Sequence, residues 1–240
     1  MRNKGSLLKE LPILVIVALV VSLFIKSFLV QFFYIPSGSM ENTLQIKDRV
    51  AVNKVPFVSN NIKRGDVVVF RDPNNWLPEP YENSTNQFVA KAKSALVTVG
   101  VLPNPAKQYL VKRVVGVGGD RVVCCTKDGK LTINGVEVTE PYIFAGNKPS
   151  EMNFDVTVPK GKLWVMGDHR GASADSRYHQ DDINKGFVPE SKVSGRVVGV
   201  IWPFKNITYI PRVDVLNKEP HEGYRTTSCH CRNLADCRCR

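Results

Sequence analysis

The feature that most constrains this chain is a long apolar stretch near its N-terminus. Leu11–Ile25 is almost purely apolar, and after an interruption at Lys26 the apolar character continues to Tyr34. As a helix, residues 11–34 would be about 36 Å long, enough to cross a hydrocarbon core of about 30 Å. Lys26 would then snorkel toward the outer interface, beside an aromatic collar at Phe32–Tyr34. We therefore predict a single transmembrane anchor.

A cleavable secretory signal would show a similar basic start and apolar middle. Two observations favour an uncleaved anchor. The apolar region is longer than in a typical signal. The nearest small-x-small triplet, Ser37–Ser39, lies well beyond the clean apolar core and directly behind Pro36. We expect the basic residues 1–10 in the cytoplasm, the anchor at 11–34 in the cytoplasmic (inner) membrane, and the rest of the chain outside.

The composition is that of a folded protein, with 43% hydrophobic and 23% charged residues. The formal net charge of +11 suits an anionic partner such as nucleic acid or a membrane surface. Lysine and arginine are scattered, and no basic helix of the kind that enters a nucleic-acid groove is visible. We therefore expect the lipid bilayer as a partner, no nucleic acid, and a monomeric protein.

From Pro36 onward the chain shows a pattern of short β-strands. The Val-rich strand candidates are Arg49–Val55, Asp66–Phe70, Tyr109–Val117, Arg121–Cys125, Leu131–Val138, Leu163–Met166 and Arg196–Ile201. Asp128-Gly129 and Asn134-Gly135 are typical of hairpin turns. Because strands and helices do not alternate, we predict a mostly β, antiparallel domain over residues 35–215.

Two segments differ from this pattern. Residues 72–107 begin with a Pro/Asn-rich loop and contain a candidate helix at 87–97, so we interpret them as an insertion on the β domain. Residues 216–240 form a polar tail containing Cys229, Cys231, Cys237 and Cys239. Their C-x-C spacing is weak evidence for a zinc site. We therefore expect no metal and no other cofactor.

Cys124 and Cys125 are adjacent within a strand candidate. Successive side chains of a strand point to opposite faces, so we do not expect a disulfide between them. None of the cysteines has the His and Asn partners of a thiol protease, so a cysteine nucleophile is not expected either.

Ile35–Met40 brings two serines and a glycine together just after the apolar stretch. Gly38 permits a tight turn that can expose a serine side chain. Such a turn can also aim a backbone N–H at a substrate carbonyl. Taken alone, the segment is more typical of an ordinary loop than of a catalytic site.

Lys112 lies inside the apolar strand candidate Tyr109–Val117. A free lysine has a pKa of about 10.4 and is charged at neutral pH, so it cannot act as a base. Burial disfavours the charged form and lowers that pKa. Lys112 is therefore a candidate base if it is buried, and an ordinary surface lysine if it is not.

A loop dense in small, polar and charged residues, Gly167–Arg177, follows the strand candidate Leu163–Met166. A polar loop at the end of a strand is a common place for a functional site. Ser173 is placed to orient a neutral amine, and Asp175 and Arg177 are placed to pair with each other.

Together these segments resemble the type I signal peptidase family, in its actinobacterial or Gram-positive form. The residues that carry the resemblance are Pro36–Met40, Arg64–Phe70, Lys112–Gly116 with Gly119-Asp120, and Gly167-Asp168 with Ser173–Arg177. They follow the family order behind a membrane anchor. The resemblance implies a catalytic β domain of the signal peptidase type, related to other Ser/Lys proteases.

The resemblance also implies a Ser/Lys dyad, in which Lys112 deprotonates the nucleophile Ser39. The Ser39 backbone N–H and the Ser37 hydroxyl would form the oxyanion hole, and Ser173 would hydrogen-bond the Lys112 amine. Further residues would support this arrangement through an Asp168–Arg113 pair, an Asp175–Arg177 pair and the glycine of the loop, Gly167.

The implied activity is removal of N-terminal signal peptides from exported preproteins after small-x-small sites. The shallow apolar pockets for the small side chains would be lined by Phe33, Ile35, Met40, Leu44 and Val111. The substrate would bind as an added strand beside Ile35-Pro36 and Leu110-Val111.

The loop departs from the common family pattern at His169, Gly171, Ala172 and His179-Gln180. His169 next to Asp168 raises the possibility of a Ser/His/Asp triad. Adjacent residues of an extended segment point to opposite sides, however, so Asp168 is poorly placed to orient its neighbour.

Two further interpretations compete with a signal peptidase: a self-cleaving repressor of the SOS response, and a membrane-tethered β domain with a metal-binding tail and no catalysis. The membrane anchor, in place of a DNA-binding helical domain, speaks against the repressor.

Overall fold

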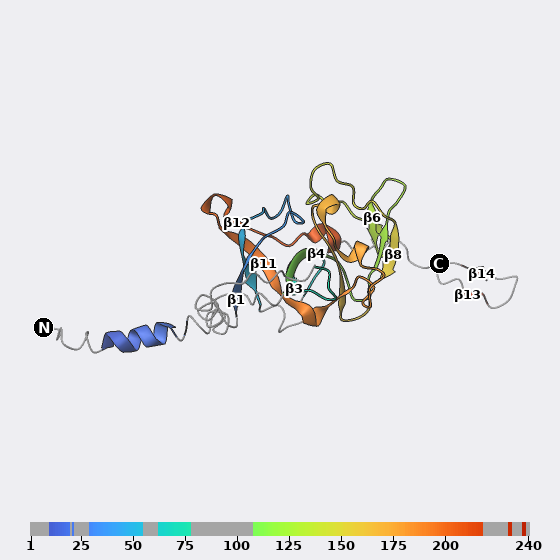
Figure 1. Ribbon diagram of the computed structural model, residues 1–240. Coiled ribbons are helices and arrows are strands. Elements are labelled where there is room, and N and C mark those ends of the chain that lie inside the picture. Colours follow the sequence, from blue (N-terminus) through green and yellow to red (C-terminus); the bar gives the residue numbers. More distant parts are fainter. Residues whose placement is uncertain are drawn as a thin grey trace.

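The computed structural model describes residues 10–19, 21, 29–54, 62–77, 108–217, 230–231 and 237–238. Residues 10–19 and 21, within the predicted anchor, are helical (Figure 1). Among the helices of the described residues, none combines the length and apolar character that crossing a membrane requires. The predicted helix at 87–97 lies outside the described residues, as do Cys229 and Cys239.

The larger of two main sheets has eight strands in the order β1-β2-β11-β3-β4-β9-β10, with β12 paired to β11. Its strands are β1 (Val30–Tyr34), β2 (Arg49–Asn53), β3 (Val67–Arg71), β4 (Tyr109–Val117), β9 (Lys162–Met166), β10 (Val188–Pro189), β11 (Val193–Trp202) and β12 (Thr208–Tyr209). Every pairing in this sheet is antiparallel, as predicted. Strand β4 therefore lies between β3 and β9, in the interior of the sheet.

A second sheet has four antiparallel strands in the order β7-β6-β5-β8. They are β5 (Arg121–Cys124), β6 (Leu131–Ile133), β7 (Val136–Glu137) and β8 (Phe154–Thr157). The predicted turn Asn134-Gly135 joins β6 and β7, and both residues have positive φ angles, 51° and 81°. This is the backbone that a two-residue hairpin requires. Further along the chain, β13 (His230–Cys231) pairs with β14 (Cys237–Arg238).

Short 3-10 helices occupy several of the connections. They are η1 (Arg170–Ala172), η2 (Ser176–Tyr178), η3 (Glu190–Lys192), η4 (Phe204–Asn206) and η5 (Asp214–Asn217). Both η1 and η2 lie within the polar loop after β9, so this loop is folded rather than extended.

Strand β1 differs from the prediction, which placed Val30–Tyr34 at the outer end of a helical anchor. It pairs with β2 in a register that sets Phe33 opposite Val50. Phe33 is buried, whereas its neighbours Phe32 and Tyr34 are exposed. This two-residue alternation is that of a strand, and hydropathy alone does not reveal it inside a continuous apolar run.

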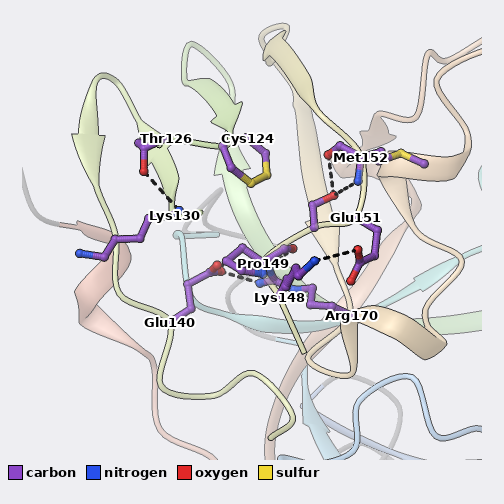
Figure 2. Close-up of a disulfide and its surroundings, with 11 residues drawn as sticks. Cys124, Thr126, Lys130, Glu140, Lys148, Pro149, Glu151, Met152 and Arg170 are labelled. Carbon is purple, nitrogen blue, oxygen red and sulfur yellow. Dashed lines mark hydrogen bonds and ion pairs between the residues drawn. A yellow bond between two sulfur atoms is a disulfide. The ribbon is translucent and has the colours of Figure 1, made fainter. Parts of the chain in front are cut away.

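Cys124 and Cys125 also differ from the prediction, because the structure joins them by a disulfide (Figure 2). The expectation that their side chains point apart assumed that the strand continues through both residues. Strand β5 ends at Cys124 instead, so the alternation of a strand does not apply to Cys125. The disulfide borders the core of the smaller sheet, where Cys124 is buried.

The first residues of the predicted insertion are tied to the domain. The Asp72 carboxylate accepts hydrogen bonds from the backbone N–H groups of Asn74, Trp76 and Leu77. Trp76 is buried, and its ring stacks on His179 with centroids 4.3 Å apart. The first residues of the predicted insertion are thus fixed beside the loop that follows β9.

The core supports the smaller sheet through fully buried side chains such as Leu131, which packs in one cluster with Trp164 and Phe154. We expect Leu131→Ala to lower the free energy of unfolding by about 2–5 kcal/mol, because it leaves a cavity in this cluster. Urea unfolding followed by tryptophan fluorescence measures the change. Ile183→Ala is the control, because Ile183 is 85% exposed. Equal losses for both variants would contradict the placement of this core.

Candidate active site

Three segments far apart in the sequence meet at one place. The first is the turn after β1, which carries Ser39; the second is β4, which carries Lys112; the third is the loop after β9. Strand β4 pairs with β3 on one side, where Lys112 lies opposite Val68. It pairs with β9 on the other, where Arg113 lies opposite Met166. Sheet pairing therefore brings the loop after β9 next to Lys112.

Ser39 and Lys112 are in direct contact. The Lys112 Nζ atom is 2.6 Å from the Ser39 Oγ atom. Both residues are buried, with 4% of Lys112 and 8% of Ser39 exposed. The pair is therefore arranged so that a neutral lysine amine can remove the serine proton.

The surroundings of Lys112 change its acidity. Its pKa falls from the ordinary value of 10.5 to about 8, chiefly because burial disfavours the charged ammonium. The negative charge of Asp175 raises this pKa, while the positive charge of Arg177 lowers it. With a pKa near 8, about one lysine in ten is neutral at pH 7, compared with fewer than about one in a thousand for a free lysine.

Backbone hydrogen bonds fix the turn that carries Ser39. The Glu41 N–H donates to the Gly38 carbonyl at 3.0 Å, and the His169 N–H donates to the Ser39 carbonyl at 3.1 Å. The side chains of Met40 and Leu44 are fully buried beneath the turn. Ser39 is thus held by the loop after β9 as well as by its own turn.

Gly167 occupies the point where this loop passes closest to Ser39. A Cβ atom added at Gly167 would clash with the Ser173 side chain and with the Ser39 carbonyl oxygen. The Gly167 N–H donates to an Asp175 carboxylate oxygen at 2.9 Å. A residue with a side chain could not take this position without displacing the nucleophile turn.

The Asp175 carboxylate contacts three residues of the loop: the Gly167 N–H described above, Arg177 and Ser173. It pairs with Arg177, as predicted, with the closest atoms 2.8 Å apart, and it accepts the Ser173 hydroxyl at 2.7 Å. The predicted hydrogen bond between Ser173 and Lys112 is not among those formed by these described residues. The Ser173 hydroxyl donates its hydrogen bond to the Asp175 carboxylate instead, because a carboxylate is a stronger acceptor than an amine.

Arg113 and Asp168 form the second predicted ion pair, and two hydrogen bonds join their side chains. Arg113 Nε and Nη2 are 2.8 and 2.6 Å from the two carboxylate oxygens of Asp168. The same guanidinium donates to the Gly65 carbonyl at 2.9 Å and lies 4.2 Å from the centroid of the Tyr142 ring. Thr43, from the nucleophile turn, donates its hydroxyl to Asp168. The pair therefore clamps that turn to β4.

Arg170 is a supporting residue that the sequence did not reveal. Its guanidinium binds the Glu140 carboxylate and the Pro149 carbonyl (Figure 2). Arg170 and Glu140 are both almost fully buried. The contact joins the loop after β9 to the segment between β7 and β8, and no local sequence pattern indicates a pairing over such a separation.

Most of the predicted pocket residues share one side of the sheet. Phe33, Ile35, Met40 and Leu44 are buried in one cluster, and Val111 packs against it. Leu110 belongs to a different cluster, as expected from its alternation with Val111 along β4. Pro36 and Ser37 are exposed, at the entrance to the turn.

His169 does not form a triad with Ser39. Its Nδ1 atom lies 3.0 Å from Glu41 Oε2, and its ring stacks on Phe144. Asp168 is directed to Arg113 rather than to the imidazole. Within the part of the chain that the structure describes, no group of three or more metal-binding side chains is arranged around an ion site.

The Arg113–Asp168 pair generates a stability prediction. Arg113→Ala leaves the Asp168 carboxylate buried and unpaired, so we expect the free energy of unfolding to fall by about 3–5 kcal/mol. Arg121→Ala is the matched control, because its ion pair with Asp155 is largely exposed and should contribute little. Urea unfolding of both variants tests the difference, and a small loss for Arg113→Ala would contradict the prediction.

Solved structures give a loose match. A crystal structure of a signal peptidase I from Enterococcus faecalis aligns with 56% of this chain and 95% of its own chain, at 24% identity and a TM-score of 0.35.

Sequence comparisons are closer. A family model described as signal peptidase, peptidase S26, matches residues 8–202. The probable signal peptidase I of Mycobacterium leprae is 37% identical over 228 residues, covering 84% of this chain and 78% of that protein. Signal peptidase I of Mycobacterium tuberculosis is 37% identical over 224 residues, covering 83% and 74%. The chain belongs to the signal peptidase family, peptidase S26.

Proposed function

We propose that this protein is a serine endopeptidase that removes N-terminal signal peptides from exported preproteins, with Ser39 as nucleophile and Lys112 as general base. The observation that carries the proposal is the 2.6 Å contact between Lys112 Nζ and Ser39 Oγ in a buried setting. Membership of the signal peptidase family supports peptide-bond hydrolysis as the reaction. The contact between Lys112 and Ser39 supports a mechanism for that reaction.

The reaction follows from the dyad. Neutral Lys112 takes the Ser39 proton as Oγ attacks the carbonyl carbon of the scissile peptide bond. The resulting oxyanion accepts hydrogen bonds from the Ser39 N–H and the Ser37 hydroxyl. Collapse breaks the C–N bond, and the Lys112 ammonium returns the proton to the leaving amine. Water then hydrolyses the acyl ester, with Lys112 taking its proton.

Burial of Lys112 explains why a lysine serves here in place of a histidine. A pKa near 8 leaves a useful neutral fraction at physiological pH. It also keeps the conjugate acid strong enough to protonate the leaving amine. The Asp175–Arg177 pair contributes by holding opposite charges together near the amine, so that Asp175 does not fix Lys112 in its charged form.

The apolar cluster beside Ser39 accounts for the substrate class. Ile35, Met40 and Leu44 are buried with Phe33, and Val111 is half-buried at the edge of the cluster. We propose that shallow apolar pockets at the edge of this cluster would accept small residues and exclude large ones. We propose that an extended signal peptide pairs with the backbone beside Ile35-Pro36 and Leu110-Val111, and that its small residues enter these pockets.

The location of the protein belongs to the same proposal. Residues 11–28 precede the turn at Leu29 that leads into β1. As a helix they would be about 27 Å long, close to the thickness of a hydrocarbon core. We propose that they anchor the chain once in the cytoplasmic membrane, with residues 1–10 inside and the β domain outside as a monomer. The proposed dyad includes no residue of the predicted insertion at 72–107 or of the predicted tail from residue 216.

Cleavage of a preprotein with an Ala-x-Ala site tests the dyad. We expect Ser39→Ala and Lys112→Ala each to lose at least about a thousandfold in kcat. The matched controls are Ser191→Ala and Lys160→Ala, which change exposed residues and should retain activity. His169→Ala should cleave far faster than either dyad variant. Cleavage by Ser39→Ala at a rate near that of the wild type, or a thousandfold loss of kcat in His169→Ala alone, would overturn the mechanism.

The pH dependence tests the role of Lys112. Only the neutral amine is a base, so kcat/KM should rise with pH and level off above an apparent pKa of about 8. Below that value the rate should fall about tenfold per pH unit. Lys160→Ala is the control and should leave the pH dependence of kcat/KM unchanged. An apparent pKa near 6.5 would instead indicate a histidine base and contradict the assignment.

A further inference from the structure

The Glu41–His169 pair lies beside the nucleophile but outside the dyad. His169 Nδ1 is 3.0 Å from Glu41 Oε2, and the imidazole stacks on Phe144 with ring centroids 4.1 Å apart. An ionised carboxylate only accepts hydrogen bonds, so Nδ1 carries the hydrogen of this contact. The side chains are 20% and 26% exposed. This is a partly covered pair with a fixed geometry, unlike a solvated ion pair.

The Glu41 carboxylate is pressed against the turn that carries the nucleophile. A Cβ atom added at Gly38 would lie 2.9 Å from Glu41 Cδ and 3.0 and 3.1 Å from its two oxygens. The carboxylate therefore occupies the space beside the Gly38 backbone. Gly38 separates Ser37 and Ser39, the residues proposed to donate to the oxyanion.

Charge balance sets Glu41 apart from the other carboxylates around the site. Three of them are held by arginines, in the pairs Asp168–Arg113, Asp175–Arg177 and Glu140–Arg170. Glu41 is paired with His169 instead. An unshielded negative charge beside the oxyanion would raise the energy of the tetrahedral intermediate, because like charges repel strongly where water is partly excluded.

We propose that His169 is a positioning residue that acts through Glu41: its imidazole holds the Glu41 carboxylate at the Gly38 turn and shields the negative charge from the oxyanion. The inference rests on the proposed function, because it presupposes that Ser39 attacks a peptide carbonyl. The His169 backbone contributes separately, by donating to the Ser39 carbonyl. That bond survives a change of side chain, so substitutions at 169 isolate the role of the imidazole.

Steady-state cleavage of an Ala-x-Ala preprotein by the full chain in detergent micelles tests the inference, with kcat and KM measured separately. His169→Ala should lower kcat roughly tenfold and change KM little, because the charge of Glu41 is left unshielded. Adding Glu41→Gln to His169→Ala should recover most of that loss, because the charge itself is gone. His169→Asn should keep kcat well above that of His169→Ala, because its amide offers a donor near the position of Nδ1.

Two controls separate this effect from a structural one. Glu151→Gln removes an exposed carboxylate that pairs with Lys148 in another loop, and it should not rescue His169→Ala. Urea unfolding of each variant measures stability, and kcat should recover in the double variant whether or not stability does. The inference is overturned if His169→Ala has the wild-type kcat, if the two substitutions lower kcat additively, or if kcat follows the unfolding free energy. Failure of the wild type to cleave the preprotein would overturn the proposed function itself.

Discussion

The burial of the Lys112 amine is the constraint on which the rest of the site depends. Burial in the interior of a sheet, away from water, disfavours the charged form of a lysine. This free-energy cost of burying the ammonium lowers the pKa of Lys112 to about 8. An unpaired carboxylate nearby would reverse the effect by stabilising the ammonium. The loop after β9 brings Asp168 and Asp175 close, and each is bound by its own arginine. The arginines thus keep the loop rigid without fixing Lys112 in its charged form.

Side chains on the two faces of strand β4 have different roles in the site. Lys112 and Arg113 are adjacent, so their side chains leave the strand on opposite faces. Lys112 meets Ser39 directly, whereas Arg113 binds Asp168 and, through it, Thr43 of the nucleophile turn. A buried pair of this kind adds little net stability compared with apolar residues, but breaking it is costly. Its value here is geometric, because it fixes where the turn lies relative to the base.

Much of this arrangement could be predicted from the sequence, and the exceptions have identifiable causes. The antiparallel β domain follows from alternation and turn residues, and the Asp175–Arg177 pair from the spacing of its two residues. The Asp168–Arg113 pair follows only from the resemblance to the signal peptidase family. Strand β1 was not predicted, because an apolar run is compatible with a helix or a strand until the strand that pairs with it, here β2, is known. The Arg170–Glu140 contact and the Cys124–Cys125 disulfide depend on where strands end and loops meet, which sequence patterns do not specify.

His169 illustrates how a departure from a family pattern can carry information. Beside Asp168 it suggested a triad, but the backbone directs Asp168 to Arg113 and the imidazole to Glu41. Its position still matters, since its own N–H holds the Ser39 carbonyl. A carboxylate at residue 41 needs a donor on the facing loop, and residue 169 is where that loop reaches the turn. The contact between His169 and Glu41 therefore joins two different segments of the chain at the nucleophile turn.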